Sequence, residues 1–366
     1  MTSYEFPPLG GGAAKMAFGL ARRLVASGDE VDVLTMGSTG LPREQEIEGI
    51  SVFRVGTDRA DQSVCSLGEA ANYLTRGLWD IRALARQRRY QLVHSHFIFP
   101  DGVLAMYVAG GTGLPYVITA HGTDVPGHNP HRLRALHTLL RPLWARVTTR
   151  AAAIVCPSVV LAEKVRAAND RANVVVIANA FNADRFRPDQ MRRPRVLSVS
   201  RMVKLKGLQY LLAAMAEVEQ ETEVVLVGDG PFAPDLRRLS KALQLDVRFT
   251  GWIDNDSARL KELYETAGIF VFPSEAENCP ISLLEAMAAG LPIVTTDDLG
   301  CKGVVGDTAV LVPPRDSSAI AGAIDRLGRS EKLRRQLGAA ARRRVVEHFG
   351  WDAHIGRYRT LYAKHV

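Results

Sequence analysis

The sequence predicts an α/β fold of two doubly wound domains, each with a parallel sheet whose strands end at a ligand site. Short apolar runs alternate with helical patterns along the whole chain, and no internal repeat or low-complexity tract interrupts them. The length of 366 residues suffices for two domains with full cores. Apolar residues make up 47% of the chain and charged residues 23%, which is typical of globular proteins.

The chain opens with a glycine-rich segment that predicts a loop facing a ligand. Gly10, Gly11 and Gly12 precede a helix predicted from Lys15 to Ser27. Consecutive glycines let the backbone approach a ligand closely and leave N–H groups facing it. The run does not follow the dinucleotide-binding pattern Gly-x-Gly-x-x-Gly, so by itself it does not indicate a particular ligand.

Two further predicted strands, at residues 92–96 and 115–120, end in histidines. His94 and His96 lie on one face of the first strand, but no third metal ligand follows at a recognisable spacing. We therefore interpret this strand end as part of the lining of the ligand site rather than as a metal site. His121 follows the second strand, and the Gly-x-Ser-x-Gly turn of a Ser-His-Asp hydrolase is absent from the sequence.

The region between Asp124 and Glu163 contains no acidic residue and predicts a basic amphipathic helix. A helix of this kind binds an anionic membrane surface or an anionic acceptor, or it packs on its own domain with a solvated basic face. The sequence leaves these interpretations open. The basic residues concerned are Arg132, Arg134, Arg141, Arg146 and Arg150.

In the second half, the predicted strand at 195–200 ends at two cations, Arg201 and Lys206. Fixed cations at the end of a strand can neutralise the charge that develops on a leaving diphosphate. The nearby Lys204 is expected to be solvated. Two more predicted strands, at 224–227 and 247–250, lead into Gly228 and into Trp252 with Ile253.

The segment from residue 267 to 292 is the most informative part of the chain. A buried strand is predicted to stop at Pro273, and a short helix is predicted to begin between Pro280 and Ser282 and to end at Gly290. The amino end of this helix offers free N–H groups and a positive dipole end, which together attract a phosphate. Glu277 before the helix and Glu285 within it can accept hydrogen bonds from hydroxyls, which suggests a nucleotide sugar.

The charge balance also favours anionic partners, because the net charge is +7. Nucleic acid is disfavoured, since the basic residues lack interleaved aromatic residues and no nucleic-acid-binding motif is present. The four scattered cysteines suit a reducing cytosol. No apolar run is long enough to span a bilayer and no signal peptide is recognised, so we expect a cytoplasmic protein that also has the option of binding the membrane face peripherally.

These motifs, taken in order, resemble the family 4 retaining glycosyltransferases, which have the GT-B fold of two Rossmann-like domains facing a cleft. The segment with Glu277 and Glu285, eight residues apart, is similar to the donor-site signature of that family. The resemblance implies that Glu277 contacts the donor sugar and Glu285 the ribose. It implies that the intervening backbone contacts the diphosphate, and the residues of this segment are Cys279, Pro280, Ile281 and Ser282.

The remaining motifs acquire roles from the same resemblance. Arg201 and Lys206 match the Arg-x4-Lys-Gly pair that stabilises the leaving diphosphate, and His121 matches the histidine near the reacting centre. The loop of Gly10, Gly11 and Gly12 matches the loop beside the donor phosphates. Gly228 belongs to a similar glycine-rich turn, and Trp252 and Ile253 are either neighbours of the base or simple packing residues.

The resemblance implies transfer of a sugar from a UDP- or GDP-sugar to an acceptor hydroxyl with retention of anomeric configuration. Neither a metal ion nor another cofactor is expected. The acceptor is expected to be a glycan, a lipid-linked molecule or a small molecule. Two alternatives stay open: a nucleotide-sugar-binding protein without transferase activity, and a phosphorylase, although no lysine anchor for pyridoxal phosphate is evident.

The resemblance covers essentially the whole chain. It implies an acceptor-side domain at 1–185, a donor-binding domain at 186–348 and a C-terminal helix at 349–366 that crosses back to the first domain. Three departures from the family pattern stand out: a first strand reduced to a few residues at 1–4, Ser200 where glycine is usual, and Gly303 where glutamate is usual. Because a central parallel strand is buried on both faces, a shortened one is expected to weaken the first domain, unless the start of the chain is misassigned.

Overall fold

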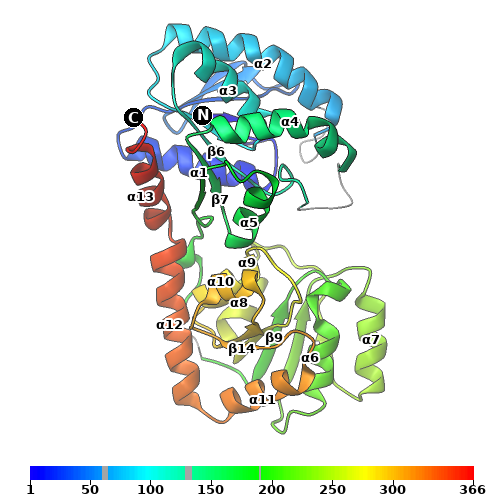
Figure 1. The fold of residues 1–366 in the computed structure, drawn as a ribbon. Helices are drawn as coiled ribbons and strands as arrows, with labels where there is room; N and C mark the ends of the chain where they lie inside the picture. The colour runs from blue at the N-terminus through cyan, green and yellow to red at the C-terminus, as the bar shows by residue number, and fades with distance from the viewer. Residues whose placement is uncertain (60–64, 128–133, 189–190) are drawn as a thin grey trace. The chain divides into compact units, whose positions relative to one another are not determined.

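The computed structural model describes residues 1–59, 65–127, 134–188 and 191–366, and side chains at 134–137 are not described. The chain divides into two units (Figure 1). The N-terminal unit comprises Met1–Asn179 together with His354–Val366, and the C-terminal unit comprises Ala180–Ala353.

The N-terminal unit contains an eight-stranded sheet in the order β3-β4-β2-β1-β5-β6-β7-β8. Neighbouring strands are parallel except for the edge pair β3 and β4, which form an antiparallel hairpin. Glu48 and Gly49 turn this hairpin with φ of 51° and 79°. The edge strand β3 has mostly exposed side chains, so its sequence lacks the apolar run of a buried strand. The strands are β1 (Thr2–Ser3), β2 (Asp32–Met36), β3 (Glu44–Ile47), β4 (Ile50–Val55), β5 (Val93–His96), β6 (Tyr116–Thr119), β7 (Ala153–Cys156) and β8 (Val174–Val176).

The strand β1 occupies the centre of this sheet although it is only two residues long. Thr2 pairs with Leu34 of β2 on one side and with Ser95 of β5 on the other. The hydroxyls of Thr2 and Ser95 are 2.7 Å apart and buried. After the strand, Phe6 is fully buried in the core, so the opening segment is anchored by packing as well as by pairing.

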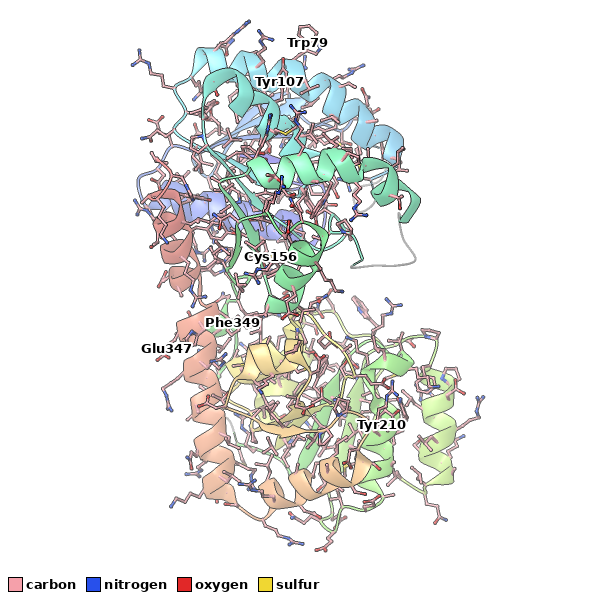
Figure 2. All side chains as sticks on the ribbon, in the orientation of Figure 1. Trp79, Tyr107, Cys156, Tyr210, Glu347 and Phe349 are labelled. Carbon is pink, nitrogen blue, oxygen red and sulfur yellow. The ribbon has the colours of Figure 1, made fainter. Side chains whose placement is uncertain are left out.

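Two helices of the N-terminal unit begin at side-chain caps. Ser66 and Glu69 form a reciprocal capping box at the start of α2, and the Ser158 side chain accepts a hydrogen bond at the start of α5. Figure 2 shows Trp79 of α2 pointing away from the unit and Cys156 of β7 within it. The helices are α1 (Gly12–Ala26), α2 (Leu67–Gln87), α3 (Asp101–Thr112), α4 (Arg134–Arg150), α5 (Val159–Ala168) and α13 (Trp351–Tyr362).

The basic helix predicted from the sequence corresponds to α4, and it packs on its own unit. Trp144 and Val147 are buried in the core, and the Trp144 indole donates a 2.9 Å hydrogen bond to the backbone oxygen of Asp124. Arg141 and Arg146 lie on the exposed face, whereas Arg132 lies outside the described residues. Across the described part of the chain, no helix has the length and apolar character needed to cross a bilayer.

The C-terminal unit contains a six-stranded sheet in the order β11-β10-β9-β12-β13-β14, and all of its pairs are parallel. Apolar side chains fill its central strands, as expected for a sheet covered on both faces. The strands are β9 (Arg195–Val199), β10 (Glu223–Val227), β11 (Val247–Phe249), β12 (Ile269–Phe272), β13 (Ile293–Thr296) and β14 (Val310–Val312). The helices are α6 (Leu208–Met215), α7 (Ala233–Ala242), α8 (Ala258–Thr266), α9 (Ile281–Ala288), α10 (Leu299–Val305), α11 (Ser317–Gly328) and α12 (Glu331–Phe349), with 3₁₀ turns η1 (Ala183–Arg185) and η2 (Lys204–Lys206).

The division between the units lies slightly before the boundary predicted at residue 185. Residues from Ala180 onward belong to the C-terminal unit because their side chains pack there. The Phe181 backbone N–H donates a 2.7 Å hydrogen bond to the backbone oxygen of Phe349, and the Arg185 guanidinium pairs with Asp256 at 3.2 Å.

The chain returns to the N-terminal unit at His354, within α13. The His354 ring is 2.8 Å from the backbone oxygen of Ala178, and the Tyr358 hydroxyl is 2.7 Å from the Thr119 hydroxyl of β6. Residues 349–353, which the sequence analysis grouped with the last helix, lie in the C-terminal unit.

Candidate functional site

The carboxyl end of β9 carries the two predicted cations on a tightly constrained loop. Lys206 lies in the turn η2, and Gly207 follows with φ of 68°. A Cβ atom at Gly207 would lie 2.0 Å from the backbone oxygen of Pro273, so glycine is required where this loop crosses the end of β12. Gly228 is constrained in the same way, because its Cβ would lie 2.0 Å from the backbone oxygen of Ser200. These approaches hold Arg201 and Lys206 in place.

The helix α9 begins where the sequence predicts it, directly after Pro280. No side chain among the described residues caps its first turn, so the N–H groups there are available to a ligand. Glu285, one turn further, is almost fully buried. The Tyr264 hydroxyl donates a 2.8 Å hydrogen bond to its carboxylate, and burial raises the pKa of Glu285 despite this bond.

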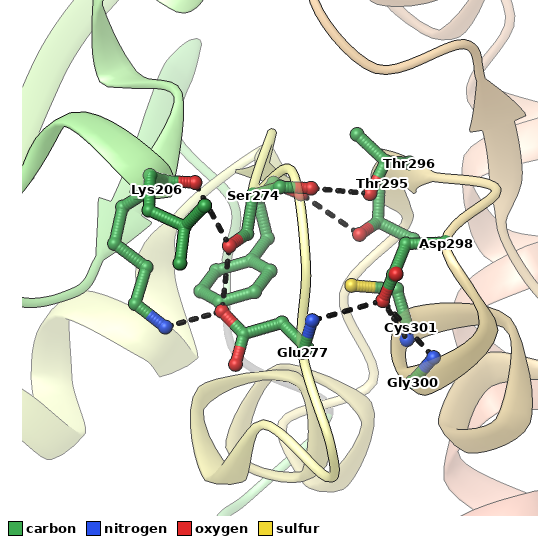
Figure 3. Close-up of polar contacts among 10 residues, drawn as sticks. Lys206, Ser274, Glu277, Thr295, Thr296, Asp298, Gly300 and Cys301 are labelled. Carbon is green, nitrogen blue, oxygen red and sulfur yellow. Dashed lines mark hydrogen bonds and ion pairs between the residues drawn. The ribbon is translucent and has the colours of Figure 1, made fainter. Parts of the chain in front are cut away.

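Glu277 is the centre of a polar network at the end of β12 (Figure 3). Its carboxylate forms an ion pair with Lys206 and accepts a 2.6 Å hydrogen bond from the Ser274 hydroxyl. The Lys206 ammonium also lies 5.6 Å from the centre of the Phe272 ring. The network fixes a cation and a carboxylate side by side, both mostly buried.

Asp298 connects this network to the next strand. Its carboxylate accepts hydrogen bonds from the backbone N–H of Glu277 and of Gly300, each 3.0 Å long, and it caps the amino end of α10. A Cβ atom at Gly300 would lie 2.1 Å from the backbone oxygen of Glu277. The backbone of Glu277 is therefore held from both sides, which limits where its carboxylate can point.

These groups line one pocket of about 570 Å³ at the carboxyl ends of the strands in the C-terminal unit. Its wall combines two cations, three carboxylates and the open amino end of α9. Trp252 is 71% exposed, whereas Ile253 is buried, so a flat aromatic surface at the rim stands beside a packed aliphatic residue. The lining residues are Val199, Ser200, Arg201, Lys206, Val227, Gly228, Asp229, Trp252, Ile253, Asn255, Phe272, Glu277, Pro280, Ile281, Ser282 and Glu285.

One residue predicted for this site, Cys279, does not line the pocket. Its side chain is partly buried, and burial raises the pKa of the thiol to about 11. The thiol therefore stays protonated near neutral pH and is no candidate nucleophile. The prediction for Cys279 concerned its backbone amide, which immediately precedes the helix.

The other predicted residues belong to the N-terminal unit. Gly11 is the N-cap of α1, and its backbone N–H is 3.4 Å from the Glu5 carboxylate. Gly10 has φ of 96°, and a Cβ there would lie 2.6 Å from Glu5, whereas Cβ atoms at Gly11 and Gly12 would meet nothing within 4 Å. Only the first of the three glycines is therefore required by the fold itself.

His121 follows β6 within a cluster of neutral rings. Its Nε2 atom is 3.1 Å from Nδ1 of His96, and Asp124 accepts a 3.0 Å hydrogen bond from its backbone N–H. Burial lowers the pKa of His121 to about 4. His94 is held between the hydroxyls of Thr119, at 2.8 Å, and Tyr362, at 2.7 Å. The two strand histidines thus take part in a protein hydrogen-bond network.

Three residues that hold Glu277 and Glu285 were not predicted, namely Ser274, Asp298 and Tyr264. Asp298 had a local signal, because an aspartate directly before a helix is a common N-cap. Ser274 and Tyr264 act through contacts across the fold, at 2.6 Å to Glu277 and 2.8 Å to Glu285, and no local pattern marks them.

Comparisons with known proteins bear on both units. Residues 10–185 match the family model described as Glycosyltransferase Family 4, and residues 193–330 match the model described as Glycosyl transferases group 1. The two models together cover most of the chain. An uncharacterized glycosyltransferase of Methanocaldococcus jannaschii is 28% identical, with 96% of this chain and 94% of that protein aligned.

Two further similarities concern proteins with described partners or activities. The glycogen synthase of Mycobacterium tuberculosis strain H37Rv is 27% identical over 96% of this chain and 91% of its own length. The crystal structure of the Anabaena protein HepE in complex with UDP superimposes with a TM-score of 0.72 at 16% identity, covering 97% of this chain and 96% of that chain.

Proposed function

The chain belongs to the group 1 glycosyltransferases of family 4, and from that premise we propose that it moves a sugar from a nucleoside diphosphate donor to an acceptor hydroxyl, with retention of anomeric configuration. The proposal includes a donor that is a UDP- or GDP-sugar and a reaction that needs no metal ion. It also includes a cytoplasmic location, with binding to an anionic membrane face as a further option.

The observation that carries the proposal is the pocket at the carboxyl ends of β9, β10 and β12. Arg201, Lys206 and the amino end of α9 converge on it, and together they form a site for a diphosphate. Glu285 and Glu277 line the same pocket and can accept hydrogen bonds from the hydroxyls of a ribose and a sugar. An anion site flanked by two hydroxyl acceptors is what a nucleotide sugar requires.

The proposed reaction is a front-face displacement, in which the acceptor attacks the anomeric carbon from the same side as the departing diphosphate. The bond between the anomeric carbon and the phosphate oxygen breaks, and the acceptor oxygen bonds to the same carbon. The acceptor proton passes to the departing phosphate oxygen. Arg201, Lys206 and the α9 amides stabilise the negative charge that the diphosphate gains. Glu277 is engaged by Lys206 and Ser274, which suits a role in positioning the sugar rather than in forming a covalent intermediate.

Several similarities support the choice of donor class without deciding the substrate. HepE was crystallised with UDP, and the similar mycobacterial protein is a glycogen synthase. His121, neutral near pH 7 because burial lowers its pKa to about 4, suits a hydrogen-bonding role toward a sugar hydroxyl. The acceptor in this proposal is a glycan, a lipid-linked molecule or a small molecule.

The test is a donor and acceptor screen with the purified chain in EDTA, with the anomeric configuration of any product read by NMR. We expect transfer from one UDP- or GDP-sugar and the same anomeric configuration in donor and product. Sugar transfer that requires added Mg²⁺ or Mn²⁺ would contradict the proposal that the reaction needs no metal ion. Binding of a nucleotide sugar without any transfer would favour the alternative of a binding protein without transferase activity.

A further inference from the structure

The C-terminal unit contains a second large groove, of about 900 Å³, that shares no lining residue with the donor pocket. It lies along α12, which packs against α9, and its lining includes Gly268 and Pro292, the residues directly before β12 and β13. Five of its lining residues are arginines and one is a glutamate. The lining consists of Pro188, Met191, Arg192, Gly268, Gly290, Pro292, Glu331, Arg334, Arg335, Gly338, Ala339, Arg342 and Arg343.

Four of the arginines stand on α12 in two pairs separated by two small residues. Arg334 and Arg342 are eight residues apart on one row of the helix with Gly338 between them, and Arg335 and Arg343 flank Ala339 on the next row. Eight residues correspond to about 12 Å along a helix. A Cβ atom at Gly338 would lie 2.2 Å from the backbone oxygen of Gly290, so α12 closely approaches the backbone at the end of α9. No side chain at Gly338 fills the groove between the arginine pairs.

Two of these arginines have a structural role that leaves their charge in place. Arg342 donates a 2.6 Å hydrogen bond to the backbone oxygen of Ala288 at the end of α9. Arg334 donates to the backbone oxygens of Leu327 and Gly328 at the end of α11, at 2.6 and 2.7 Å. Carbonyl oxygens satisfy the N–H groups of a guanidinium, but they carry no net charge and do not neutralise it. Arg342 also pairs with Asp184 at 3.4 Å, but the Asp184 side chain is 92% exposed, and such a pair contributes little.

The other two have no such structural role. Arg335 pairs with Glu331 at 2.6 Å, but both side chains are strongly exposed, at 80% and 65%, and such a pair contributes little. Arg343 is exposed and has no ion-pair partner among the described residues. Placing these two cations next to Arg334 and Arg342 costs repulsion that an anion in the groove would relieve.

We propose that this groove is a binding site for a ligand that carries two or more phosphate groups, separate from the donor pocket. The planar guanidinium binds phosphate oxygens with two parallel hydrogen bonds, and two pairs of guanidinium groups suit two phosphates better than one. A free polyphosphorylated compound and the headgroups of anionic lipids share this chemistry. The inference does not depend on the proposed transferase activity, because none of its residues belongs to the donor pocket.

The experiment titrates inorganic tripolyphosphate into the full chain by calorimetry, with Arg201→Ala as the background so that the donor pocket is impaired. The groove variant R335A/R343A removes two exposed arginines. The matched control R238A/R248A removes two exposed arginines of the same unit that lie outside the groove, where they face Asp235 and Glu223. A parallel arm measures sedimentation with vesicles of phosphatidylcholine alone and with a third of phosphatidylglycerol.

We expect the groove variant to weaken tripolyphosphate binding or retention on anionic vesicles at least about tenfold, and the control to leave both within about twofold. Binding of tripolyphosphate alone would identify a free phosphorylated ligand. Retention on anionic vesicles alone would identify a lipid headgroup. Equal binding by the groove variant and the control, or no binding in either arm, would overturn the proposal.

Discussion

The two units place polar residues at the carboxyl ends of parallel strands, yet they do so with opposite chemistry. In the C-terminal unit, the strand ends carry charges in an open pocket, with Lys206 paired to Glu277 and Glu285 held by Tyr264. In the N-terminal unit, the strand ends carry imidazoles and hydroxyls, and His94 and His96 are almost fully buried.

This difference in charge follows from how deeply the strand ends are buried in each unit. Burial lowers the pKa of His94 and His96 well below the ordinary value, so these two imidazoles act as neutral donors and acceptors near pH 7. In the pocket of the C-terminal unit, Lys206 is paired with Glu277 and Arg201 is exposed to solvent. A doubly wound sheet therefore supports a charged anion site or a neutral hydrogen-bond network, depending on how far its strand ends are covered.

The largest expected effect is on turnover in the charged region. Lys206→Ala should lower kcat by about 10²- to 10³-fold, because a fixed cation facing the leaving group is typically worth about 2.7 to 4 kcal/mol of barrier. The matched control is Lys204→Ala, which removes an exposed lysine of the same turn. Steady-state rates together with circular dichroism check this, and similar rates for the two variants would remove Lys206 from the catalytic account.

The next effect concerns the backbone of the loop that carries Arg201 and Lys206. Gly207→Ala should destabilise the C-terminal unit by about 3 kcal/mol or more, because the new Cβ would lie 2.0 Å from the Pro273 oxygen at a positive φ. Gly303→Ala, in the interior of α10, should be neutral or stabilising by about 0.5 to 1 kcal/mol, since its Cβ meets nothing within 4 Å. Urea unfolding measures both, and equal stability of the two variants would contradict the geometry.

The third prediction separates the units by pH. His121 and His354 have pKa values of about 4 in the folded unit because burial disfavours their charged forms, against about 6.5 when unfolded. Between pH 6.5 and 4 the unfolded chain takes up protons that the folded unit does not, so stability falls as the pH drops. Burial raises the pKa of Asp101 and Asp124, which offsets part of this loss.

We therefore expect His121 and His354 together to cost the N-terminal unit about 4 kcal/mol between pH 7 and pH 5, reduced by the contribution of Asp101 and Asp124, and the C-terminal unit, whose one histidine is His348, to lose less. Urea unfolding followed by limited proteolysis and mass spectrometry reports the two units separately. A larger loss in the C-terminal unit would show that the histidine cluster does not control acid stability.

The smallest effect concerns Glu285, the most deeply buried carboxylate of the pocket in the C-terminal unit. Tyr264→Phe should weaken binding of the donor nucleotide by about 1 kcal/mol, because Glu285 loses its 2.8 Å hydrogen bond and is no longer held in position. Tyr107→Phe is the control, since that hydroxyl accepts a hydrogen bond from the exposed Arg82 in the N-terminal unit. Calorimetry with the nucleotide measures the difference, and unchanged affinity in Tyr264→Phe would mean that Glu285 does not contact the donor.

The sequence predicted the family and the two doubly wound domains correctly, because both depend on local signals. Apolar runs marked the central strands, and the stretch from Pro273 to Pro292 marked the strand, loop and helix around α9. The edge strand β3 escaped prediction because its residues are exposed and lack the apolar run of a buried strand. The roles of individual site residues stay predictions.

Residues that act across the fold could not be identified from local patterns. Ser274 and Asp298 hold Glu277 from two different strand ends, and their spacing in the chain gives no sign of this. The observed division lies before residue 185 for a similar reason, since the ion pair of Arg185 with Asp256 is a tertiary contact.

The central claim is that the pocket in the C-terminal unit binds the diphosphate of a nucleotide donor through Arg201, Lys206 and α9. Calorimetric titration of the purified chain with UDP and with GDP in EDTA, repeated with Arg201→Ala, tests it most directly. The account predicts binding of one nucleotide without a metal ion and a loss of at least about tenfold in the variant. Undiminished binding by the variant, or no binding of either nucleotide by the unaltered chain, would contradict it.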